Sequence, residues 1–126
     1  LMAAMQDGVG ATWEIEVVQD GRVSDGLHHL GTGISASRLG DGTEVVVYGD
    51  GTTGDLWLAA RGDQPGCWHT LRAFSSGTWV WPAIAGMTGG AVAMTAVRLQ
   101  LNSDLKAERS LKMLSIASPT GACATP

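Results

Sequence analysis

Tryptophan is the residue type in this chain with the clearest capacity for binding chemistry. Five Trp occur among 126 residues, against one Tyr and one Phe. The face of an indole ring stacks on the C–H surfaces of sugars and on cations. Trp79 and Trp81 stand two positions apart in the run TWVWP, so they share a face wherever that run is extended. We predict that these two side chains line a binding cleft.

The other reactive residue types do not form a recognisable catalytic set. Of the three His residues, His28 and His29 are adjacent, and adjacent side chains of an extended chain point in opposite directions. No G-x-S-x-G motif occurs, and nothing marks one Ser as a nucleophile. We therefore expect no catalytic residue, although an active site completed by further chain stays an alternative.

Acidic residues recur in Gly-rich turns, at Asp41, Asp50 and Asp55. Such oxygens are Ca²⁺ ligands in some proteins, but the spacing lacks the EF-hand pattern and its bidentate Glu. Asp next to Gly typically sets turn geometry. We expect no metal site and no cofactor.

The chain has two cysteines, Cys67 and Cys123, without the C-x-x-C spacing of a zinc site. They either form one disulfide that ties the C-terminal residues to the body or remain two thiols. The disulfide implies an oxidising compartment, and with it a secreted or cell-surface location. The sequence leaves both alternatives open.

Charge and hydropathy exclude several classes of partner. The net charge of −4 and the pI of about 5.1 offer no basic face for nucleic acid. No apolar run approaches 18 residues, so we expect no membrane span. The chain starts at Leu1 without a charged segment followed by an apolar one, which suggests a processed or excised chain without a visible signal peptide.

Short strands dominate the expected secondary structure. In WEIEVVQ, residues 13–19, apolar Trp13, Ile15 and Val17 alternate with two Glu, which predicts a strand with one dry and one wet face. The 18 Gly suit many tight turns. Only residues 102–114 have a helix-friendly composition, with a cap at Asn102 or Ser103. Further strands are expected at 35–38, 43–48, 55–60, 67–71, 82–85 and 91–97.

The strands repeat. Trp13 and Trp57 lie 44 positions apart, as do Leu27 and Leu71, and TGDLWLAA at 53–60 aligns with NSDLKAER at 102–109 after a shift of 49. Repeats of this length with four short strands are typical of β-propeller blades. The repeat places two further strands at 104–109 and 111–116, in competition with the helix.

This layout resembles the repeats of tectonin-type and fucose-binding propeller lectins, through DG…EVVVYGDGTTGDLWLAA…GCWHTL and WPAIAGMTGGAVAMTAV…NSDLKAE. The resemblance covers about residues 10–116. It implies an all-β, propeller-like fold with a half unit at 10–30, units at 31–74 and 75–117, and a flexible tail at 118–126. The second unit departs from the pattern, because GMTGG replaces its Asp-Gly turn and Lys106 stands at the position of Trp57.

The resemblance implies a carbohydrate-binding module with ligands in clefts between blades. The expected ligand-binding residues are Trp79, Trp81, Trp68, Arg61, Arg72 and Asp55. Two and a half blades leave a ring open, so we expect closure by two or three copies, by another protein chain or by a longer chain. The alternative function is a protein-interaction subunit or a fragment of a larger β-propeller, including that of a hydrolase.

Overall fold

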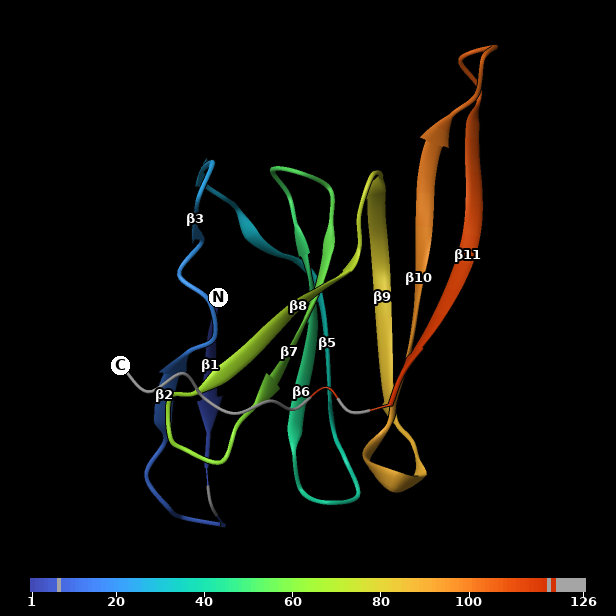
Figure 1. Cartoon of the computed structure of the whole chain (residues 1–126). Coiled ribbons are helices and arrows are strands. Elements are labelled where there is room, and N and C mark those ends of the chain that lie inside the picture. Colours follow the sequence, from blue (N-terminus) through green and yellow to red (C-terminus); the bar gives the residue numbers. More distant parts are fainter. Residues whose placement is uncertain (7, 118, 120–126) are drawn as a thin grey trace.

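The computed structural model describes residues 1–6, 8–117 and 119, and this part of the chain is all-β (Figure 1). The sheets are antiparallel, and none of them closes on itself. The described part contains no α-helix, and it holds no helix that could span a membrane. The strands are β1 (Met2–Met5), β2 (Glu14–Val17), β3 (Arg22–Val23), β4 (Gly26–Leu27), β5 (Leu30–Arg38), β6 (Glu44–Asp50), β7 (Leu56–Arg61), β8 (Trp68–Phe74), β9 (Thr78–Gly86), β10 (Val92–Leu101) and β11 (Ala107–Ile116).

A four-stranded meander, β5-β6-β7-β8, forms the centre of the molecule. Its strands fall on the four ranges predicted between residues 35 and 71, which confirms that part of the strand assignment. The β-branched run of β6 favours an extended chain, and Gly-rich turns end it on both sides. The pairing is antiparallel throughout, for example Val47 opposite Leu58 and Leu58 opposite Leu71.

The next sheet has three strands, β9-β10-β11, where the repeat predicts four. Residues 107–116 form one strand instead of the two predicted at 104–109 and 111–116, because residues 102–106 form the turn. There the Asn102 side-chain oxygen accepts the backbone N–H groups of Asp104 and Lys106 at 3.0 and 2.9 Å. Ten residue pairs then join β11 to β10, from Leu101–Ala107 to Val92–Ile116. This pairing outweighs the local helix preference of the segment.

The sheets stack face to face with the four-stranded sheet in the middle. Val45 and Val47 of β6 pack with Met94 of β10 on one side, and Tyr48 packs with Val18 on the other. Because successive residues of a strand point to opposite faces, β6 contributes to both cores. Figure 1 shows the three-stranded sheet on one flank and the β1-β2 hairpin on the other.

The β1-β2 hairpin buries the face of β2 that carries Glu residues, whereas the alternation of its sequence predicts burial of the apolar face. Glu16 of β2 is buried against the four-stranded sheet, whereas Trp13, Ile15 and Val17 are exposed. The reason is a set of polar partners: Arg61 holds the Glu16 carboxylate through two hydrogen bonds, of 3.1 and 2.6 Å, and Trp68 donates a third of 2.9 Å. The expected tail at 118–126 lies, apart from Pro119, outside the described residues.

Candidate functional site

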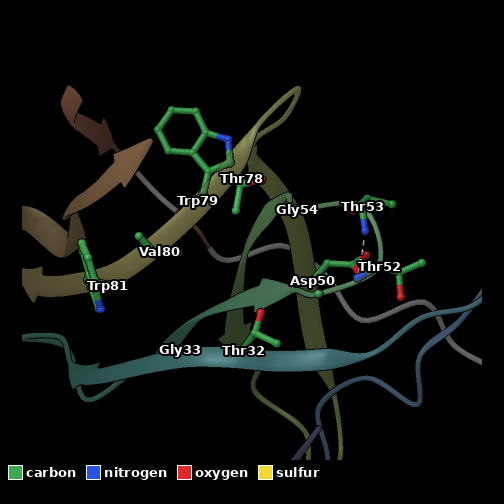
Figure 2. Close-up of a pocket in the computed structure, with 11 residues that line it drawn as sticks. Thr32, Gly33, Asp50, Thr52, Thr53, Gly54, Thr78, Trp79, Val80 and Trp81 are labelled. Carbon is green, nitrogen blue, oxygen red and sulfur yellow. Dashed lines mark hydrogen bonds between the residues drawn. The ribbon is translucent and has the colours of Figure 1, made fainter. Parts of the chain in front are cut away.

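A groove of about 500 Å³ opens where the β6-β7 loop meets β5 and β9 (Figure 2). The four Thr residues at this groove are exposed, and so is Trp81. Hydroxyl groups and an indole ring therefore form its accessible surface. The lining residues are Thr32, Gly33, Asp50, Gly51, Thr52, Thr53, Gly54, Thr78, Trp79, Val80 and Trp81.

The β6-β7 loop is a tight, internally bonded turn. One oxygen of Asp50 accepts the backbone N–H groups of Thr52 and Thr53, at 2.9 and 3.3 Å. The Asp50 carbonyl accepts the N–H of Gly54 at 2.8 Å, and the Gly54 carbonyl accepts the N–H of Trp79 at 3.2 Å. These bonds attach the loop, which lines one side of the groove, to β9.

Glycine is required at one position of this loop. Gly54 has φ +78°, and a Cβ built there would lie 2.4 Å from the carbonyl oxygen of Gly77. A left-handed backbone and this close approach both exclude larger residues. Gly54 therefore sets how closely the loop approaches the β8-β9 connection.

Trp79 and Trp81 both line the groove, but they do not share a face. Trp79 is 7% exposed and stacks on Phe74 with ring centroids 4.5 Å apart, whereas Trp81 is 66% exposed. In Figure 2 the two rings point to different sides of β9. The cause is a β-bulge, since the register shifts between Ala83–Thr95 and Val80–Val97, and Trp81 has φ +51°. The prediction that Trp79 and Trp81 share a face required a regular extended chain between them, and the bulge interrupts it.

A second hollow, of about 470 Å³, lies on the other side of the same loop. Asp55 and Arg72 meet in it at 3.4 Å, and the Arg72 guanidinium lies 6.0 Å from the centre of the Trp57 ring. The buried Trp57 Nε1 has no hydrogen-bond partner among the described residues. This hollow is thus more charged than the groove, and the loop 50–55 separates the two.

His28 joins Asp25 and Asp50, two of the three acidic residues that line this hollow among the described residues. Its Nδ1 lies 2.5 Å from Asp50 and its Nε2 lies 3.1 Å from Asp25. The hydrogen bond to Asp50 raises the pKa of His28; burial opposes the rise, and the charges of Asp50 and Asp25 add to it. Burial acts to raise the pKa of Asp50, but hydrogen bonds from His28, Thr52 and Thr53 lower it overall. Both ring nitrogens are occupied, so His28 anchors the loop and is not a free base.

The remaining predicted ligand residues lie elsewhere. Arg61 and Trp68 surround the Glu16 carboxylate, and Arg61 also lies 3.5 Å from Glu44. The structure therefore divides the predicted set into three places: Trp79 and Trp81 at the groove, Asp55 and Arg72 in the adjacent hollow, and Arg61 and Trp68 under the hairpin. The Cys67–Cys123 disulfide stays a prediction, because Cys123 lies outside the described residues.

Sequence reasoning missed the hydroxyl groups of the groove and the role of His28. The pair Thr52-Thr53 in the DGTTGD turn was a visible signal for the first. His28 and Asp50 are 22 positions apart, and no local pattern joins them. Two of the three Asp residues act in turns as expected: Asp41 and Asp50 accept backbone N–H groups two residues ahead. Asp55 instead accepts the backbone N–H of Ser76, at 3.2 Å.

Comparison with known proteins adds no relative. No protein-family model matches the sequence, no curated protein matches it, and no solved structure matches the fold.

Proposed function

We propose that this protein is a carbohydrate-binding module and that its ligand occupies the groove between β5, β9 and the β6-β7 loop. The exposed, left-handed Trp81 carries the proposal. A non-Gly residue in this region costs of the order of 1 kcal/mol, and an exposed indole forgoes burial of a large apolar surface. Strain and exposure that coincide at the rim of a groove are typical of a binding position.

The chemistry of the groove favours a neutral, hydroxyl-rich ligand. Thr32, Thr52, Thr53 and Thr78 are exposed around it. Asp50, the one carboxylate at the groove within the described part of the chain, is 1% exposed and is engaged by His28. Sugars combine an apolar C–H face with several hydroxyls, so the Trp81 ring and the Thr side chains match the two surfaces of one ligand.

Binding of a glycan identified on an array, measured by calorimetry per chain in solution, tests this proposal. We expect Trp81→Ala to weaken the affinity about tenfold, or about 1.4 kcal/mol. Trp13→Ala is the matched control, because Trp13 is 62% exposed but lies outside the groove, and we expect it to leave the affinity unchanged. Unchanged binding by Trp81→Ala, or an array without any bound glycan, would contradict the proposal.

We also infer that the stacked sheets are consecutive blades of a propeller-like arrangement. Two observations support this inference. The first is that the four-stranded sheet is a simple meander. The second is that its first strand, β5, lies against β9, the first strand of the next sheet. A Cβ built at Gly33 of β5 would lie 3.1 Å from the side chain of Pro82 in β9. A crystal structure in which these first strands surround a common axis would support it, and one in which the sheets diverge would refute it.

A further inference from the structure

Two apolar sheet faces lie uncovered at opposite ends of the stack. The first, which we name the hairpin face, consists of Met2, Ala4, Ile15 and Val17. The pairs Met2–Val17 and Ala4–Ile15 place these four side chains on one side of the β1-β2 hairpin. The three large side chains are well exposed: Met2 is 63% exposed, Ile15 67% and Val17 55%. The other side of the hairpin covers the four-stranded sheet.

The second, which we name the β11 face, consists of Val97, Leu101, Leu111 and Met113. Val97 is paired with Leu111, and alternation along β10 and β11 places all four on the side away from the buried Val92 and Met94. Leu101, Leu111 and Met113 are 66%, 71% and 76% exposed. A continuous group of large exposed apolar side chains marks an interaction site more often than a free surface.

The chain segments that carry the two faces have net charges of opposite sign. Residues 1–20 contain four acidic and no basic residues, whereas residues 92–116 contain four basic and two acidic ones. Among the described residues of the first segment, Glu16 is buried against Arg61, and Glu14 and Asp20 are exposed. By the alternation that defines the faces, Arg109 lies on the β11 face, whereas Glu14 and Lys112 are exposed on the opposite side of their sheets. Opposite charges attract across an interface, and like charges placed together oppose association. A contact of the β11 face with itself would bring basic residues together, and the same holds for acidic residues at the hairpin.

We propose that copies of this chain associate head to tail, with the hairpin face of one copy on the β11 face of the next. The two faces differ, so the contact is heterologous and leaves one free face of each kind at the ends of an open assembly; a suitable rotation closes it into a ring. This proposal does not depend on the carbohydrate proposal, because neither face includes a groove residue.

Two variants that each block one face test the proposal by light scattering over a range of concentrations. Ile15→Glu adds a charge to the hairpin face next to acidic residues, and Leu111→Lys adds one to the β11 face next to basic residues. Both positions are largely exposed, so the fold is retained, which circular dichroism checks. We expect the unchanged chain to associate and each variant alone to have the single-chain mass of 13.0 kDa.

The mixture of the two variants gives the decisive result. Ile15→Glu keeps its β11 face and Leu111→Lys keeps its hairpin face, so an equal mixture restores one contact and gives twice the single-chain mass. Self-association of either variant alone would show a contact between like faces and overturn the proposal. So would a mixture that stays at the single-chain mass, or an unchanged chain that remains monomeric at every concentration.

Discussion

Trp79 and Trp81 are two positions apart on β9, yet the first is 7% exposed and the second 66% exposed. The bulge at Trp81–Pro82 separates them, since these two residues together oppose Ala96 of β10. Trp79 consequently packs in the core between Phe74 and Arg98, whose guanidinium lies 5.9 Å from its ring. One bulge thus divides a pair of like residues into a core packing residue and an exposed residue at the groove.

The left-handed backbone at Trp81 predicts an unusual order of stability. Asn tolerates this backbone region better than Ala or Trp. We expect Trp81→Asn to have a free energy of unfolding about 0.5–1 kcal/mol higher than Trp81→Ala, of the order of the left-handed penalty for a residue with a Cβ. Denaturant unfolding of both variants measures the difference. If Ala is as stable as Asn here, the backbone at this position is not strained in solution.

The loop at Gly54 predicts a second difference, between two glycines with similar backbones. Gly54 and Gly66 have φ +78° and +73°, but a Cβ at Gly66 meets nothing within 4 Å. Gly66→Ala therefore measures the backbone penalty alone, about 1 kcal/mol. We expect Gly54→Ala to lower the free energy of unfolding by clearly more, because the loop must move away from Gly77. Equal losses in urea titrations would show that the loop adjusts freely.

The His28–Asp50 pair predicts a dependence of stability on pH. The pKa of His28 is raised above its ordinary value of 6.5 in the folded chain. The stability that protonated His28 contributes is therefore fully present below the pKa of the unfolded chain and is lost as the pH rises through the pKa of the folded chain. We expect the urea midpoint to fall over that window, and His28→Gln to flatten the fall. His29→Gln is the control at the adjacent position, and its urea midpoint should fall with pH as that of the unchanged chain does. A profile that His28→Gln leaves unchanged would exclude this pair as the cause.

The buried Glu16 predicts that the hairpin depends on one carboxylate. Glu16→Ala removes three hydrogen bonds to this carboxylate, two from Arg61 and one from the Trp68 N–H. A hydrogen bond to a charged group contributes about 1.5–3 kcal/mol. We expect a loss of about 2–4 kcal/mol in the free energy of unfolding, against a small effect of the exposed Glu14→Ala. The pKa of Glu16 is lowered in the folded chain, first by the hydrogen bond from Arg61. The stability that the ionised Glu16 contributes is therefore lost as the pH falls through its folded-state pKa. Glu16→Ala should no longer show this loss of stability at acidic pH. Thermal unfolding of both variants at neutral and acidic pH provides the test.

Local patterns were sufficient for most of the strands. Alternation, β-branched runs and Gly-rich turns located β6, β7 and β8, because these features act within a few residues of one another. The 44–49-residue repeat also predicted strands, and no helix, between 102 and 116. It did not predict that β11 is one continuous strand, since that depends on the side chain of Asn102 and on ten pairs with β10.

The sequence by itself determined that the chain is all-β, that turns lie at its Asp-Gly positions and that Trp is its most frequent aromatic residue. Only the tertiary structure decided which Trp faces solvent, which face of the hairpin is buried, and that His28 reaches Asp50. These outcomes depend on residues far apart in the chain, such as Glu16 and Arg61, whose mutual hydrogen bonds outweigh the burial of Ile15 and Val17. Periodicity describes which residues share a face, but the partner that covers the face decides whether it is buried.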